Sequence, residues 1–212
     1  TAQLPARILA LPDSGPGLLT ISQTCAVATC PPTLGPTPNA WAGGVAHDPR
    51  DRGTWISNGA LIAEVNPRTG CNVTCAPLPA PNLAIGQVVT ALAYNEDSNR
   101  LFVSHSDNRI LTYSVAGCNL TLISQCTVTV PTNHVIGGLA TGDASQRIWY
   151  VSSPWLGPNT FFPWALFSSA PQSNPCAATC GPMQINDCAI TPTQPMSRVT
   201  GLAFDTCGPG GG

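Results

Sequence analysis

Short apolar stretches alternate with turn-forming residues along this chain. Val89–Tyr94 and Arg100–Ser104 are rich in apolar and aromatic residues and predict two strands, separated by a turn at Asn95–Asn99. Arg109–Val115 alternates polar and apolar residues, as expected for a half-buried strand, and Cys126–Val130 is expected to be a fourth strand. This stretch of sequence therefore predicts one antiparallel sheet of four strands.

A short phrase repeats along the chain and identifies this sheet as a repeating unit. Each copy contains a small residue, an apolar residue, an alanine and a turn-like ending. The copies are Gly44–Asp48, Ala91–Asn95, Gly138–Gly142 and Gly201–Asp205. The first three alanines are 47 residues apart and the fourth follows after 63, as expected if one unit carries an insertion of about 16 residues. Periods of about 40 to 50 residues built from short strands indicate propeller blades.

Three further units follow the same plan. The first unit is expected to contain the strands Trp41–Ala46, Thr54–Ser57, Ala60–Val65 and Asn72–Pro77. In the third unit, Arg147–Val151 is the predicted second strand, and an insertion at Ser153–Pro163 precedes the third. The fourth unit combines Val199–Asp205 with strands from the other terminus, namely Ala6–Leu11, Gly17–Ile21 and a segment that begins at Cys25. Pairing of the two termini would complete this unit.

The segment from Ala91 to Val115 resembles the YVTN-type and NHL-type blades of the β-propeller superfamily, and the repeat extends this resemblance over nearly the whole chain. The Gly-His and Trp-Asp marks of WD40 repeats are missing. The resemblance implies an all-β fold, a propeller of four four-stranded antiparallel blades in a single domain, 1–212. The expected blades are 41–80, 88–131, 136–191 and a fourth that is split between 199–207 and 5–34. Such a chain could close alone, pair with a second copy into eight blades, or pass its terminal strand to a neighbour.

The composition narrows the classes of partner. Hydrophobic residues make up 43% of the 212 residues, whereas charged residues make up only 8%, and the formal net charge is −2. Eight basic residues scattered along the chain form no stripe for nucleic acid, and no run of about 18 apolar residues predicts a membrane span. With so little charge repulsion between copies, self-association is plausible.

The ten cysteines follow the units. We expect four hairpin disulfides and one bridge near the C-terminus, with the pairs Cys25–Cys30, Cys71–Cys75, Cys118–Cys126, Cys176–Cys180 and Cys188–Cys207. Zinc or an iron–sulfur cluster is disfavoured, because the C-x₃-C pairs belong to different units and lack clustered histidines. Disulfides imply an oxidising compartment, so the protein is expected to be secreted, outside the cell or at its surface, and a chain that starts at Thr1 is expected to be a mature form.

Two N-x-T sequons lie beside hairpin cysteines at matching places in two units. They begin at Asn72 and Asn119 and are candidate glycosylation sites in a host that glycosylates secreted proteins. Chance occurrence in a threonine-rich chain is the alternative.

Catalysis has little support in the sequence. There is no G-x-S-x-G elbow, the three histidines are dispersed, and most acidic residues lie in or beside turns. On the opposite loops only Asp13 and Asp107 could contribute to a calcium site. We therefore predict no enzyme activity, no cofactor and no resident metal, with a propeller hydrolase or lyase as the alternative.

The strongest candidate for a binding surface is the face that carries the insertion. Four aromatic residues lie within ten positions there, and three polar residues and another tryptophan come from neighbouring loops. The predicted contact residues are Trp155, Phe161, Phe162, Trp164, His105, Asp107, His134 and Trp41. A protein or a glycan could bind them, or the insertion could instead plug the channel. The predicted function is a non-catalytic interaction or structural module that binds a protein, a glycan or its own copies; the alternative is a building block of an extracellular filament or surface layer with strand pairing in trans.

Overall fold

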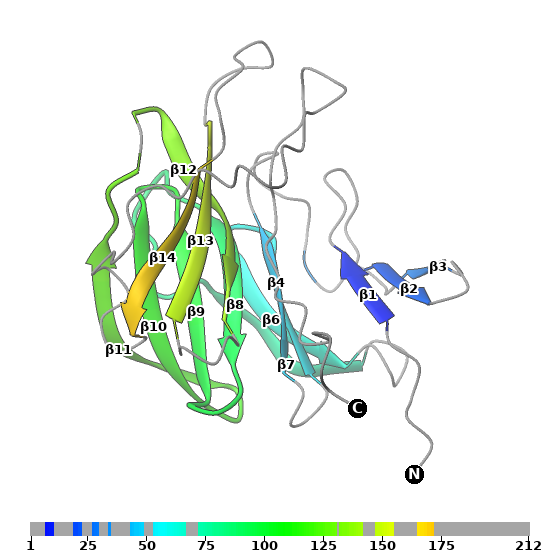
Figure 1. Cartoon of the computed structure of the whole chain (residues 1–212). Helices are drawn as coiled ribbons and strands as arrows, with labels where there is room; N and C mark the ends of the chain where they lie inside the picture. The colour runs from blue at the N-terminus through cyan, green and yellow to red at the C-terminus, as the bar shows by residue number, and fades with distance from the viewer. Residues whose placement is uncertain are drawn as a thin grey trace.

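The computed structural model describes residues 7–10, 19–22, 27–29, 34, 43–48, 53–66, 72–130, 132–141, 147–154 and 165–171 (Figure 1). All regular structure in these residues is β-strand, arranged in four antiparallel sheets. The predicted all-β class with four-stranded antiparallel sheets is therefore confirmed. In the described part of the chain, no helix has the length and apolar character needed to cross a membrane.

Two sheets have four described strands each, in sequence order from one edge to the other. The first comprises β4 (Gly44–Asp48), β5 (Gly53–Ser57), β6 (Leu61–Asn66) and β7 (Asn72–Pro79). The second comprises β8 (Val89–Asn95), β9 (Arg100–His105), β10 (Arg109–Ala116) and β11 (Asn119–Thr127).

The fourth strand of the second sheet differs from its prediction. Strand β11 begins at Asn119 rather than at Cys126, because Gly117 adopts a φ of 58° and lets the chain reverse within two residues after β10. Residues 128–130 then lie beyond the end of the strand.

The other two sheets have three described strands each. One contains β12 (His134–Ala140), β13 (Arg147–Pro154) and β14 (Ala165–Pro171), so residues 155–164 connect its second strand to its third. The other contains β1 (Arg7–Ala10), β2 (Leu19–Ser22) and β3 (Val27–Thr29). The predicted strand at Val199–Asp205, and with it the closure of a ring by the termini, lies outside the described residues.

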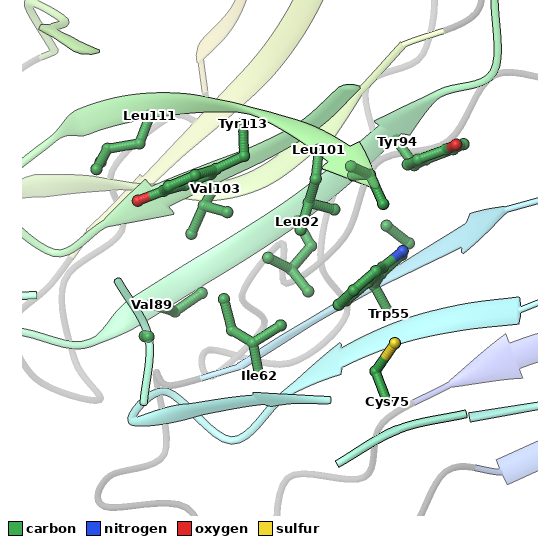
Figure 2. Close-up of a cluster of buried hydrophobic side chains, with 13 residues drawn as sticks. Trp55, Ile62, Cys75, Val89, Leu92, Tyr94, Leu101, Val103, Leu111 and Tyr113 are labelled. Atoms are coloured by element: carbon green, nitrogen blue, oxygen red, sulfur yellow. The ribbon is translucent and has the colours of Figure 1, made fainter. Parts of the chain in front are cut away.

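Strands β8 to β10 of the sheet β8–β11 are buried on both faces. One face packs on the sheet β4–β7, where Trp55, Ile62 and Cys75 oppose residues of the second sheet (Figure 2). The other face packs Phe102 and Ile110 against Tyr150 of the sheet β12–β14. The expected half-burial of Arg109–Val115 is thus wrong: Ile110 to Tyr113 are all buried, because each side of β10 meets a neighbouring sheet.

The innermost strands explain the small residue of the repeated phrase. Strand β8 contacts both β4 and β12. At Gly44, a Cβ would come within 2.7 Å of the backbone nitrogen of Leu92 and 2.9 Å of the carbonyl carbon of Ala91. Only a residue without a side chain permits this approach between β4 and β8.

A disulfide joins two different sheets and corrects the predicted pairing. Cys75 in β7 is bonded to Cys118 in the turn before β11, 43 residues away. The predicted pairs Cys71–Cys75 and Cys118–Cys126 are therefore wrong. Cys118 precedes β11 whereas Cys126 lies near its far end, opposite Ile110. Since a strand rises about 3.3 Å per residue, these two cysteines are much too far apart for a bond that needs Cα atoms within about 7 Å.

Candidate interaction surface

Four turns and connections meet at one end of the stacked sheets. We call this end the loop end and define it by residues 58–60, 80–88, 105–109 and 132–134. Backbone hydrogen bonds join its parts: Val89 N donates to Gly59 O at 2.8 Å and Ser106 N donates to Val88 O at 2.9 Å. The β5–β6 and β9–β10 turns therefore fix the chain where it passes from the first sheet into β8.

Arg109 organises the polar groups of the loop end. Its Nε donates to Asp107 Oδ2 at 2.6 Å, and its Nη2 donates to Gln87 Oε1 at 2.9 Å and to Asn82 O at 3.3 Å. Gln87 Nε2 donates in turn to Asp107 Oδ2 at 2.6 Å. Burial would raise the pKa of Asp107, but hydrogen bonds from Arg109 and Gln87 outweigh it and keep that pKa below its ordinary value. The carboxylate is thus an ionised partner that ties the connection 81–88 to the β9–β10 turn.

Tyr113 supports the same connection from the buried side. Its hydroxyl donates to Pro81 O at 3.0 Å and accepts from Asn82 Nδ2 at 3.2 Å. Burial raises the pKa of Tyr113, so the hydroxyl stays protonated and keeps its donor role. Asn82 has a φ of 58°, a left-handed conformation that asparagine tolerates better than most residues.

The supported connection presents one fully exposed apolar side chain. Ile85 has a relative exposure of 105% and no described neighbour covers it, whereas Leu83, two residues earlier, packs against the core. The connection is therefore anchored at Leu83, Asn82 and Gln87 and open at Ile85. An apolar side chain in this position is available to a partner.

His105 lies beneath this surface rather than on it. The side chain is fully buried, with Nδ1 3.4 Å from Arg109 Nη2, and its Nε2 is a buried atom without a hydrogen-bond partner. Burial first, and then the positive charge of Arg109, lower the pKa of His105 to about 4, although Asp107 opposes the shift. The imidazole is consequently neutral at physiological pH and lies below the surface.

His134 is also buried and connects the second sheet to the third. Its Nδ1 lies 3.2 Å from Ser152 Oγ, and burial lowers its pKa. Asn108 binds the same segment with both ends of its amide: Nδ2 donates to His134 O at 3.1 Å, and Oδ1 accepts from Ile136 N at 3.2 Å. The arrangement is a junction between sheets.

The structure brings together some of the predicted contact residues. His105, Asp107 and His134 all lie at the loop end, but only Asp107 is partly exposed there. Trp41, Trp155, Phe161, Phe162 and Trp164 lie outside the described residues. Ile85, Gln87 and Arg109 were missed, because a lone isoleucine or arginine carries no motif.

A polar repeat was also missed, although the sequence contains it. Asn58, His105 and Ser152 are 47 residues apart and are buried at the loop-end side of their sheets. In the first sheet, Asn58 Oδ1 accepts from the backbone nitrogens of Ala60 and Leu61 and so closes the β5–β6 turn. Aligning the units by the 47-residue period would have revealed this position.

Two other predicted features can be placed. Asn72 and Asn119, the sequon asparagines, are exposed and begin β7 and β11, at the opposite end of the strands from the loop end. Within the described ranges, no group of three or more His, Cys, Asp or Glu side chains could hold a metal ion.

Comparison with known proteins gives a likeness in structure but none in sequence. No protein-family model matches the chain, and no curated protein matches it by sequence. The β-propeller domain of Cps50 (Swd1) from Myceliophteria thermophila is similar in structure with a TM-score of 0.50 at 13% identity, covering 82% of this chain and 56% of that chain. A chain from the nidogen/laminin complex gives a TM-score of 0.52 at 11% identity, covering 81% of this chain and 59% of that chain.

The chain thus spans a little over half of the length of these two similar chains. The likeness concerns the fold, and it agrees with the stacked antiparallel sheets and the 47-residue repeat. The chain is thus similar in fold to β-propeller domains.

Proposed function

We propose that this chain is a non-catalytic, extracellular protein-interaction module whose contact surface is the loop end. The observation that carries the proposal is the exposed Ile85, on a connection that is fixed by Arg109, Gln87 and Tyr113. A contact loop that is already ordered loses little conformational entropy when it binds, so more of the contact energy appears as affinity.

The low charge of the surface favours a protein that binds through apolar contacts over a highly charged partner. Only 8% of the residues are charged, and Asp107 and Arg109 neutralise each other beside the exposed isoleucine. An apolar anchor surrounded by paired polar groups is the usual anatomy of a protein contact. One chain of similar fold comes from a nidogen/laminin complex, and this also supports a protein partner.

The Cys75–Cys118 disulfide supports the proposed secretion, because disulfides persist in oxidising compartments. We also propose that Asn72 and Asn119 carry glycans in a glycosylating host, since both are exposed. Glycans at these positions would leave the loop end uncovered.

We propose further that four blades close within one chain, as expected from the two terminal segments. Light scattering of the non-reduced protein tests this: a monomer near 21.9 kDa before glycosylation supports closure in cis. A defined dimer or long polymers would favour completion by a second copy.

Photo-crosslinking tests the contact surface. A photoreactive amino acid replaces Ile85 in one variant and Ile123, which is 48% exposed on β11, in a matched control. Both variants are produced by secretion from a glycosylating cell. They are then mixed with extracellular proteins of the organism from which the sequence comes, and the mixture is illuminated. We expect a defined protein partner to crosslink from position 85 and not from position 123.

Affinity for that purified partner is then compared between Ile85→Asp and Ile123→Asp. Burying an isoleucine contributes about 1.5–3 kcal/mol, so Ile85→Asp should weaken binding at least about tenfold. Ile123→Asp should leave binding unchanged. Equal affinities, the same products from both positions, or capture of free oligosaccharide alone would contradict a protein-binding loop end.

A further inference from the structure

The disulfide between Cys75 and Cys118 follows the order of the repeat. Each unit has two cysteines after its third strand, and this bond joins the second cysteine of one unit to the first cysteine of the next. Cys75 lies in the outermost strand of the sheet β4–β7, and Cys118 lies in the turn that leads into the outermost strand of the sheet β8–β11. The bond therefore connects neighbouring sheets at their outer edges.

Cys71 and Cys118 occupy equivalent positions. They are 47 residues apart, which is the period of the repeat, and each directly precedes the first residue of an outermost strand, Asn72 or Asn119. The local sequence is C-N-x-T at both places. In the sequence of the first unit, Cys71 thus has the position that Cys118 has in the second unit, and it follows the cysteines at 25 and 30 by one unit.

Cys126 is also in a disulfide, and its partner is not in the described part of the chain. The residue is half-buried in β11, opposite Ile110, and is disulfide-bonded. The two other cysteines in the described ranges, Cys75 and Cys118, are bonded to each other. The partner of Cys126 is therefore one of the seven remaining cysteines of the sequence.

We propose that the outermost strands are tied in series, each second cysteine to the first cysteine of the following unit. This rule pairs Cys126 with Cys176, which is the first cysteine after β14. Strand β14 is the third strand of its sheet, just as β10 is the third strand of the preceding sheet. It also pairs Cys30 with Cys71. The sheets of the propeller are then fastened to one another around the rim, instead of each hairpin being closed on itself.

Formation of each bond is a two-electron oxidation. Two thiols lose two protons and two electrons as the S–S bond forms, and an external disulfide of the secretory compartment accepts them and is reduced to a dithiol. The same exchange can break a wrong pair formed during synthesis, so the series can be reached from local pairs.

Direct mapping of the secreted full chain tests the proposal. The protein is blocked with an alkylating reagent without reduction and digested with chymotrypsin, which can cleave after Leu120 and Leu122 and so separate Cys118 from Cys126. Mass spectrometry with electron-transfer fragmentation then identifies the cysteine linked to Cys126. We expect Cys176; a link from Cys126 to Cys118, Cys180, Cys188 or Cys207 would overturn the rule.

Two variants give an independent readout with a matched control. Cys176→Ser should leave one alkylated thiol at Cys126, whereas Cys180→Ser, four residues away, should leave Cys126 oxidised. If Cys180→Ser frees Cys126 instead, the proposed order is wrong. The mapping of the unmodified protein decides the matter where either variant fails to be secreted.

Discussion

The sheet β8–β11 has two neighbours, and the two junctions are fastened differently. At the junction with β4–β7, Trp55 and Tyr113 pack in a common core, and the Cys75–Cys118 disulfide crosses from sheet to sheet. At the junction with β12–β14, Phe102 and Tyr150 form a similar core, and the amide of Asn108 provides two of the connecting hydrogen bonds.

The comparison shows which contacts between sheets recur at both junctions and which occur at only one. Alternate residues of β8, β9 and β10 face opposite sheets, so the period of two in each strand supplies apolar packing at both junctions. The turn after the second strand also reaches the next sheet at both places, through Gly59 O in one case and the Asn108 side chain in the other. Side-chain hydrogen bonding therefore differs between the two junctions, whereas apolar packing is common to both.

Removing the disulfide should have the largest effect on the comparison. The double variant Cys75→Ala/Cys118→Ala releases a loop of 43 residues, for which chain entropy predicts a loss of about 4 kcal/mol in the free energy of unfolding. Urea unfolding of the variant and of the parent protein measures it. An unchanged midpoint would mean that packing and hydrogen bonds alone determine the stability of the first junction.

The close approach at Gly44 offers a second way to disturb the first junction. Gly44→Ala places a Cβ within 2.7 Å of the Leu92 nitrogen, so β4 and β8 must move apart, with an expected loss of about 1–3 kcal/mol.

Gly86→Ala is the control for this substitution. Its Cβ would meet nothing within 4 Å, and only its φ of 82° opposes the change, at about 1 kcal/mol. Equal losses of unfolding free energy for the two variants would show that the contact with β8 does not limit position 44.

Asn108→Gly tests the second junction. Glycine accepts the φ of 63° at this position, so the variant removes the two side-chain hydrogen bonds without straining the turn. The expected loss is about 1–2 kcal/mol, because Ile136 N and His134 O each lose a hydrogen bond to Asn108.

Asn108→Asp sharpens the same test. It keeps an acceptor for Ile136 N but places a carboxylate oxygen against the carbonyl oxygen of His134, so its loss should be no smaller than that of Asn108→Gly. Hydrogen exchange at Ile136 should accelerate in Asn108→Gly. Unchanged exchange would contradict the bridging role of Asn108.

The repeat was readable from the sequence because packing between sheets is periodic. The 47-residue spacing and the turn residues located nearly all the described strands, and the small residue at Gly44 is explained by the approach of β8. The partner of Cys75 was misassigned because nearness in sequence was taken as nearness in space, whereas the stacked sheets bring Cys118 to it. Ile85 and Arg109 could not be identified, because their importance depends on a connection whose path is decided by tertiary hydrogen bonds.

A further expected effect is one of pH, and it concerns the buried polar position that the units share. His105 is neutral when folded, with a pKa lowered to about 4 mainly by burial, against about 6.5 when unfolded. The unfolded chain therefore binds the proton more readily. The contribution of His105 to stability is complete above about pH 6.5 and is lost as the pH falls toward 4.

His105→Asn, which copies Asn58 of the first sheet, should flatten the fall in unfolding free energy between pH 6.5 and 4. Part of the slope should remain, because burial also lowers the pKa of His134. Urea titrations at several pH values within this window measure the slope, whatever the variant costs at pH 7. A variant that loses stability as steeply as the parent protein would show that the buried His105 does not cause the loss of stability at low pH.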